Sequence, residues 1–178
     1  SGLSAGSNML SVTDANGCLN STLSTLTHPL ELETNNLTVN PTCYDYADGV
    51  AQITVIGGTT PYTYLCNPGG QTTATAIGLI TGNYNCIITD ANGCQINSVG
   101  IFVGEPTQTV ITEFNTPLDC NNGTNGTATV SVSGGGFPYT YLWNNGQTTA
   151  IATGLISGNY NCNITDVNGC IINSGNIF

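Results

Sequence analysis

The sequence repeats itself at a spacing of 76 residues, and this period limits the possible folds more than any other feature does. The stretch Gly78–Cys94 returns with few changes at Gly154–Cys170, and a weaker copy spans Gly2–Cys18. A fixed period is the mark of a tandem array, and each period here is long enough to form a small domain. The sequence therefore predicts small domains that follow one another along the chain.

The period divides the chain into three units. Residues 1–33 correspond to the C-terminal fragment of a repeat plus a connector. Two full repeats are predicted at 34–106 and 107–178. Pro29 and Pro106 take matching places in the two connectors, which supports these boundaries.

Each full repeat predicts short β-strands and no helix. In the strand Asn83–Ala91, one set of alternate positions turns polar in the second copy, so the other set is expected to face a core. The dipeptide Asn92–Gly93 favours a type I′ hairpin turn, because both central residues of that turn need positive φ. Earlier strands are expected at Leu37–Val39 and Val50–Ile56. Six or seven short strands in about 75 residues are typical of a β-sandwich.

Four motifs occur in the same order in both full repeats. They are Gly-Gly-x-x-Pro-Tyr-Thr-Tyr-Leu-x-Asn, Gln-Thr-Thr-Ala, Gly-Leu-x-x-Gly-Asn-Tyr and Thr-Asp-x-Asn-Gly-Cys. Together they resemble the SprB repeat, which is named for a gliding-motility adhesin of Bacteroidetes. The resemblance covers both full copies and the fragment. It implies an all-β fold of tandem Ig-like or PKD-like sandwiches within a very large secreted surface protein.

We interpret the chain as an extracellular structural and adhesive segment of a bacterial cell-surface protein, with a fibre- or filament-forming role. Such a segment would act mechanically and by multivalency, through end-to-end self-association and contacts with surface glycans. The alternative is a carbohydrate-binding module of a secreted enzyme. An exposed row of aromatic side chains or a repeated calcium site would favour that alternative.

The charge composition argues against several classes of partner. The chain has no Lys or Arg and a formal net charge of −10. Nucleic acid is therefore not expected as a partner, since no side chain would neutralise its phosphates. A polybasic membrane contact is excluded for the same reason. No apolar run approaches the ~18 residues of a membrane-spanning helix, so no membrane insertion is expected in this segment.

The eight cysteines indicate an oxidising compartment. They lack the spacing of a metal site, and disulfides account for them better. We predict the pairs Cys43–Cys94 and Cys120–Cys170, which would close matching loops of about 50 residues and contribute roughly 4 kcal/mol each in the chain-entropy model.

The other cysteines depart from the family pattern. Cys86 and Cys162 stand where valine is expected, and Cys66 stands where the second copy has Trp143. Cys66 and Cys86 fall on neighbouring predicted strands and could form a bridge. The matching Cys162 faces Trp143 and cannot form one, so a bridge is not the favoured prediction. Cys18 is expected to have its partner outside this sequence.

The predicted core centres on three aromatic residues. Tyr84 and Tyr160 follow Gly-Leu-x-x-Gly-Asn and precede a cysteine by two residues, which resembles the tyrosine corner of Ig-like domains. Both rings are expected to be buried, on the same inner layer as Trp143.

Asn-X-Ser/Thr sequons mark the candidate glycosylation sites. Glycosylation at them would require a secreted route, and unmodified surface asparagine is the alternative. The five sites are Asn20, Asn36, Asn122, Asn125 and Asn163.

The sequence offers little for catalysis or cofactor binding. The single histidine, His28, lies in a connector and has no counterpart in the other repeat, so we expect no enzyme activity from these residues. No cofactor is expected. A calcium site is an alternative if Asp45, Asp48 and Asp90 converge near the Cys43 end of the repeat, although Asp45 and Asp48 are replaced by asparagine in the second copy.

Tyr44 and Tyr46 are candidates for stacking against sugars. Their counterparts in the second copy are Asn121 and Gly123, so the feature is not general to the repeats. Packing within the loop is the alternative explanation.

Overall fold

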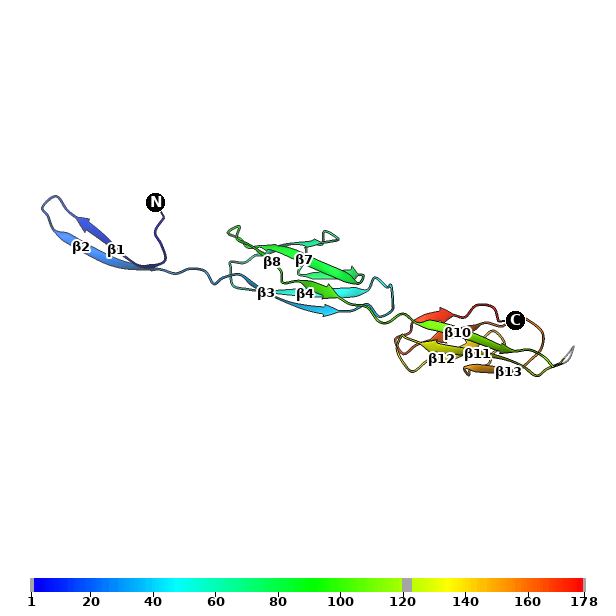
Figure 1. Cartoon of the computed structure of the whole chain (residues 1–178). Coiled ribbons are helices and arrows are strands. Elements are labelled where there is room, and N and C mark those ends of the chain that lie inside the picture. Colours follow the sequence, from blue (N-terminus) through cyan, green and yellow to red (C-terminus); the bar gives the residue numbers. More distant parts are fainter. Residues whose placement is uncertain (1, 120–122, 178) are drawn as a thin grey trace.

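The structure, a computed structural model, describes residues 2–119 and 123–177. The described residues form strands and turns but no helix, and Figure 1 shows three units following one another along the chain. In chain order the strands are β1 (Gly6–Thr13), β2 (Leu19–Leu26), β3 (Glu33–Val39), β4 (Gly49–Ile56), β5 (Thr63–Asn67), β6 (Thr75–Leu79), β7 (Gly82–Thr89), β8 (Gln95–Asn97), β9 (Ile101–Val103), β10 (Val110–Thr116), β11 (Gly126–Ser133), β12 (Thr140–Trp143), β13 (Ile151–Leu155), β14 (Cys162–Thr165) and β15 (Ile171–Asn173). The all-β prediction is confirmed.

The first full repeat, here called repeat 1, is a sandwich of two antiparallel sheets. One sheet has the order β3-β4-β6, and the other has the order β5-β7-β8. The short strand β9 pairs with the start of β7 and also lies against β3 and β4, so it closes one side of the sandwich. This two-layer arrangement is the predicted Ig-like β-sandwich.

The second full repeat, repeat 2, has the same plan. Its sheets have the orders β10-β11-β13 and β12-β14-β15. In place of the β7–β9 pairing, Tyr160 and Ile177 form an isolated bridge through two backbone hydrogen bonds.

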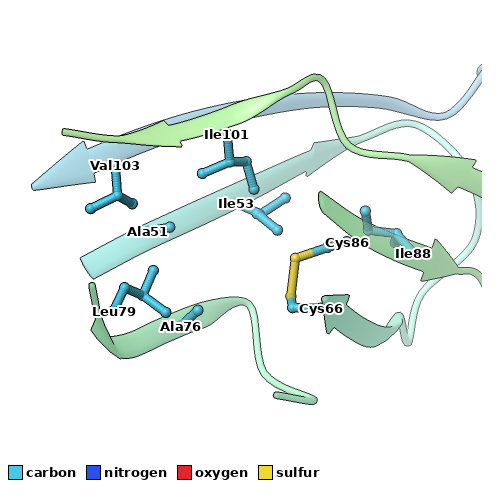
Figure 2. Packing of buried hydrophobic residues seen from close by; sticks show 9 residues of the cluster. All are labelled: Ala51, Ile53, Cys66, Ala76, Leu79, Cys86, Ile88, Ile101 and Val103. Atoms are coloured by element: carbon cyan, nitrogen blue, oxygen red, sulfur yellow. A yellow bond between two sulfur atoms is a disulfide. The ribbon is translucent and has the colours of Figure 1, made fainter. Parts of the chain in front are cut away.

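The core of repeat 1 lies between the two sheets and follows the alternation of the strands. Figure 2 shows Ala51 and Ile53 from β4 facing Cys86 from β7 and Ile101 from β9. These side chains are at most 4% exposed, because successive residues of a strand point to opposite faces. Repeat 2 builds its core from the matching positions, with Trp143 at its centre.

The predicted core aromatics are confirmed in position and only partly in burial. Trp143 is 1% exposed, and its indole N–H donates to the carbonyl oxygen of Thr149 at 2.8 Å. Tyr84 and Tyr160 are half-buried rather than fully buried. Their hydroxyls donate to carbonyl oxygens four residues upstream, at 3.0 and 3.1 Å, as in a tyrosine corner. Each ring covers the core edge while its hydroxyl anchors the preceding turn.

One pair of directly opposed residues, on β5 and β7 in repeat 1 and on β12 and β14 in repeat 2, differs between the two repeats. In repeat 1, Cys66 on β5 lies opposite Cys86 on β7, and the two form a disulfide with a Cα–Cα distance of 3.9 Å. In repeat 2, Trp143 lies opposite Cys162, which is a buried free thiol. The sequence comparison argued against this bridge because Cys162 has no cysteine opposite it, and the structure corrects that prediction, since both opposed positions of repeat 1 carry cysteine.

The hairpin of β1 and β2 corresponds to β7 and the strands that follow it. The two strands pair in register from Gly6 with Leu26 to Thr13 with Leu19. Leu10 and Val12 match the core residues of β7, yet each is 62% exposed here. An isolated two-stranded hairpin buries too little apolar surface to form a core.

Among the described residues, we find no helix of the length and apolar character needed to span a membrane.

Candidate functional site

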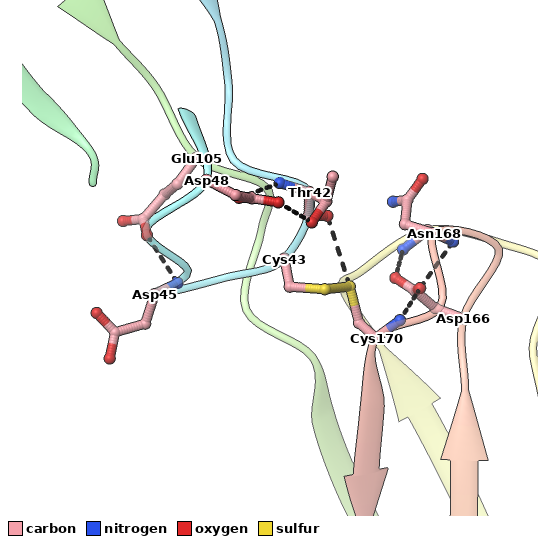
Figure 3. The surroundings of a disulfide bond; sticks show 9 residues. Thr42, Cys43, Asp45, Asp48, Glu105, Asp166, Asn168 and Cys170 are labelled. Carbon is pink, nitrogen blue, oxygen red and sulfur yellow. Dashed lines mark hydrogen bonds between the residues drawn. A yellow bond between two sulfur atoms is a disulfide. The ribbon is translucent and has the colours of Figure 1, made fainter. Parts of the chain in front are cut away.

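The two repeats meet at a joint to which each contributes one loop. Repeat 1 contributes the loop between β3 and β4, which contains Cys43. Repeat 2 contributes the hairpin turn between β14 and β15, which leads to Cys170. Figure 3 shows the two loops in contact beside the connector that carries Glu105.

The Cys43 loop is held by local hydrogen bonds. The Thr42 amide and hydroxyl both donate to the Asp48 carboxylate, at 3.0 and 2.5 Å. The hydrogen bonds from Thr42 hold the pKa of Asp48 below its ordinary value. The Tyr46 amide donates to the Cys43 carbonyl at 3.2 Å, and Asp45 adopts a left-handed φ of 62° that Asp tolerates better than most residues. These contacts fix the loop in one shape.

The hairpin of repeat 2 is organised by the carboxylate of Asp166. One carboxylate oxygen accepts the amides of Asn168 and Cys170 at 2.8 and 2.9 Å, and the other accepts the amide of Gly136 at 2.9 Å. Burial acts to raise the pKa of Asp166, but the amide donors outweigh it and hold the pKa below its ordinary value. The carboxylate therefore ties the hairpin to the body of repeat 2 and sets the direction of Cys170.

A disulfide joins the two loops across the joint. Cys43 and Cys170 have an S–S distance of 2.02 Å and a Cα–Cα distance of 5.7 Å, within the normal range. The Cys170 sulfur also lies 3.5 Å from the carbonyl oxygen of Thr42. Together with the connector, this bond gives the joint two covalent links.

The predicted pairing of these cysteines is wrong. Cys94 is an exposed free thiol, and Cys170 is bonded to Cys43 rather than to Cys120. Cys120 itself lies outside the described residues. The prediction paired a cysteine of the Cys43 type with a cysteine of the Cys94 type inside one repeat. The observed bond pairs the same two types of cysteine, but Cys43 belongs to repeat 1 and Cys170 belongs to repeat 2.

Strand direction explains why a bond within one repeat cannot form. Cys43 follows Pro41 by two residues, and both Pro41 and Val103 lie against Gly49. Val103 pairs with Gly82 at the start of β7, which places the Cys43 loop at that end of the strand. Cys94 follows the other end of β7. Eight residues of strand at about 3.3 Å each separate the two ends by roughly 26 Å, far beyond the ~7 Å limit for a disulfide.

A cleft of about 170 Å³ lies next to the disulfide. Tyr44 and Tyr46 line it from repeat 1, and they are 43% and 53% exposed. Thr107 and Asp166 line it from repeat 2. The cleft therefore combines exposed aromatic rings with polar groups.

The three aspartates of the calcium hypothesis do not share one end of repeat 1. Asp48 is bonded to Thr42 in the Cys43 loop. Asp90 accepts amides from Thr59, Asn92 and Cys94 at the opposite end. Within the described ranges, no group of three or more His, Cys, Asp or Glu is placed to hold a metal ion.

Four of the five sequons lie within the described residues, and all four asparagines are exposed. The Asn36 side chain donates to the Val99 carbonyl at 3.2 Å, and the Asn125 side chain donates to Asp119 at 2.5 Å. The exposed sites are Asn20, Asn36, Asn125 and Asn163, and the fifth site, Asn122, is not among the described residues. His28 is exposed in its connector.

Comparison with known families bears on these repeats directly. The model of the SprB repeat matches residues 35–71 and 112–148. The chain is therefore similar to SprB repeats at two places, one in each sandwich. Each match begins within the first strand of a sandwich and ends after the β5 or β12 strand, so it covers the first half of each sandwich.

One similar solved structure is titled "Structural basis for Dscam isoform specificity", with 12% sequence identity and a TM-score of 0.30. The match covers 86% of this chain and 49% of the other, so the present chain spans about half the length of that protein. The search of curated proteins returned no match.

The joint disulfide is the functional feature that sequence reasoning missed. The signal for it was present, because both cysteine positions recur with the repeat. Counting the strands and their directions between Cys43 and Cys94 places these two cysteines at opposite ends of one repeat. When two repeats follow each other, Cys43 of the first repeat therefore lies at the same joint as Cys170 of the second.

Proposed function

We propose that this chain is an extracellular structural and adhesive segment of a bacterial surface protein, in which SprB repeats stack end to end in a fibre. The observation that supports the proposal best is the disulfide between Cys43 and Cys170. A covalent bond across the joint restricts bending between repeats, which a spacer or fibre needs and an independent binding domain does not. It also suits an oxidising compartment outside the cell.

The surface chemistry supports the same proposal. The chain has no Lys or Arg and few charges, and the faces of the sandwiches combine uncharged polar residues with exposed apolar side chains such as Leu37, Ile77 and Phe102. Such faces permit side-by-side contacts with sister chains. Glycans attached at exposed sequons such as Asn36 and Asn163 would extend this polar surface.

Sedimentation and microscopy together test the proposal. The oxidised chain is expected to form elongated, concentration-dependent assemblies in analytical ultracentrifugation, and electron micrographs are expected to show filaments with an axial repeat of one SprB repeat. A monodisperse monomer at all concentrations, with isolated particles in micrographs, would refute the fibre role.

A carbohydrate-binding module is the second candidate, and the cleft at the joint favours it. Tyr44 and Tyr46 offer exposed rings next to polar groups, the usual composition of a sugar-binding surface. Titration with a panel of oligosaccharides, read by tyrosine fluorescence, tests this candidate. Binding that is lost in the Tyr44→Ala and Tyr46→Ala variants would support it, and no binding at millimolar sugar would reject it.

A further inference from the structure

The free end of repeat 1 has the same construction as the end of repeat 2 that carries the joint disulfide. In repeat 2, the Gly135 amide donates to the carbonyl oxygen of Thr107 at 3.0 Å. In repeat 1, the Gly58 amide donates to the carbonyl oxygen of Leu30 at 2.8 Å. The connector is therefore seated against the following sandwich in the same way in both repeats.

The hairpin that carries the cysteine is also the same in both repeats. Asp90 accepts the Thr59 amide at 3.0 Å and the amides of Asn92 and Cys94 at 2.9 Å each. The Ala91 amide in turn donates to the Thr59 carbonyl at 2.9 Å. Repeat 2 reproduces these contacts with Gly136, Asp166, Val167, Asn168 and Cys170. Cys94 therefore has the same orientation in its hairpin as Cys170, which forms the disulfide with Cys43.

The two hairpins differ in what covers them. Cys170 is covered by the Cys43 loop, whereas Cys94 is an exposed free thiol. We propose that Cys94 and the end of repeat 1 around it form a docking site for another SprB repeat, which contributes a loop of the Cys43 type and joins Cys94 through a disulfide. The established joint shows the partner's chemistry, since a loop of this type occupies the equivalent surface of repeat 2.

Formation of this bond is an oxidation that needs a named oxidant. The Cys94 thiol and the partner thiol each lose a proton, and one S–S bond forms between them. The two electrons pass to a small-molecule disulfide such as oxidised glutathione, which takes up the two protons and leaves as two thiols. An oxidising extracellular compartment supplies such disulfides.

Cys18 provides a matched control within the same chain. Its hairpin has the same carboxylate contacts, because Asp14 accepts the amides of Asn16 and Cys18 at 2.9 and 2.8 Å. Cys18 is likewise an exposed free thiol. The β1–β2 hairpin, however, has no sandwich beneath it and so lacks the connector and the glycine turn that complete the docking surface. A preference for Cys94 over Cys18 therefore measures docking rather than thiol reactivity.

The test uses two full-length versions of the chain in a glutathione redox buffer. The donor carries Cys170→Ser, which frees Cys43, together with Cys18→Ser, Cys94→Ser and Cys120→Ser. The acceptor carries Cys120→Ser and keeps its joint disulfide, so its exposed thiols are Cys18 and Cys94. Mixed disulfides are mapped by mass spectrometry after cleavage next to aromatic residues, because the chain offers trypsin no site.

We expect the bond from Cys43 to Cys94 to exceed the bond from Cys43 to Cys18 by at least tenfold. A donor that also carries Cys43→Ser should give no product at Cys94. Equal yields at the two acceptor cysteines, or a Cys94 that stays free, would overturn the proposal. Circular dichroism of the donor confirms that its sandwiches remain folded.

This inference rests on the proposed end-to-end stacking of SprB repeats, yet the two can fail separately. Filaments that form with Cys94 still free would leave the fibre role standing and refute the docking site. A specific bond at Cys94 without filaments would support the docking site and refute the fibre role.

Discussion

At the residue scale, Asp90 and Asp166 make the stability of the repeats depend on pH. Burial acts to raise the pKa of each carboxyl group, but the backbone amides around it outweigh burial and hold the pKa below its ordinary value. A carboxyl group with a lowered folded-state pKa stabilises the fold above the unfolded pKa of about 3.9, and this contribution is lost as the pH falls through the folded-state pKa.

We therefore expect Tm to change little between pH 7 and pH 5 and to fall below about pH 4. The double variant Asp90→Asn and Asp166→Asn should have a Tm several degrees lower at pH 7, because an amide group cannot accept hydrogen bonds through both of its terminal atoms. Its Tm should also vary less below pH 4. Calorimetric scans across this range provide the measurement. A parallel fall in both proteins would assign the acid sensitivity to other carboxylates.

The tyrosine corners are a second contribution at this scale. The hydroxyls of Tyr84 and Tyr160 bond to backbone carbonyl oxygens, and the half-buried rings pack on the core edge. Tyr84→Phe should lower the free energy of unfolding of repeat 1 by about 1 kcal/mol, the usual net value of one hydrogen bond. Urea denaturation measures it. Tyr44→Phe is the control, since Tyr44 is exposed in the Cys43 loop, and a similar loss there would contradict the assignment.

At the scale of elements, the two sandwiches stabilise the same strand pair by different means. Repeat 1 uses the disulfide between Cys66 and Cys86, which are 20 residues apart, and repeat 2 packs Trp143 over Cys162. The double variant Cys66→Ala and Cys86→Ala should destabilise repeat 1 by roughly 3 kcal/mol. Repeat 2 should be unaffected, and Trp143, the sole tryptophan of the chain, reports on it by fluorescence.

In thermal unfolding of the double variant, circular dichroism should then show a transition of repeat 1 at lower temperature. The fluorescence of Trp143, which reports on repeat 2, should not change in that transition. Cys162→Ala is the matched control, because it removes a buried cysteine that forms no disulfide. If both signals shift together in the double variant, the two sandwiches unfold as one unit.

Sequence patterns predicted the interior strand β4 well and the edge strand β3 poorly. The expected strand Val50–Ile56 corresponds to β4, which begins one residue earlier, because its alternating apolar residues face the core. The expected strand Leu37–Val39 is only the end of β3, which starts at Glu33. Its first residues are polar and are held in the sheet by backbone pairing with β4, so their side chains carry no periodic signal.

The joint between repeats was less accessible from sequence for a related reason. The spacing of Cys43 and Cys94 fixes how far apart they lie along the chain, but it does not show at which end of a sandwich each one lies. That depends on the number and direction of the strands between them. The position of Trp143 in the core and that of Tyr84 at the core edge needed no such count, because local patterns in the sequence indicate which face of a strand each residue occupies.

At the scale of the whole molecule, the disulfide between Cys43 and Cys170 changes how tension passes through the chain. The two cysteines are 127 residues apart, and the segment between them contains most of both sandwiches and the connector. Tension applied to residues 2 and 177 passes along the chain to Cys43, across the S–S bond and on from Cys170. Apart from the β1–β2 hairpin, only β3 and β15 lie in the stretched path, so the bond shields the other strands of both repeats.

Single-molecule pulling measures this shielding as a change in contour length. The double variant Cys43→Ser and Cys170→Ser should extend further than the oxidised parent chain, because the 127-residue segment then bears the load, less the 20 residues that the disulfide between Cys66 and Cys86 keeps hidden. At about 3.5 Å per residue, the gain is roughly 370 Å. Cys162→Ala, which removes a cysteine without opening a loop, should extend no further than the parent. Equal extension of the parent and the double variant would show that the joint disulfide does not carry the load.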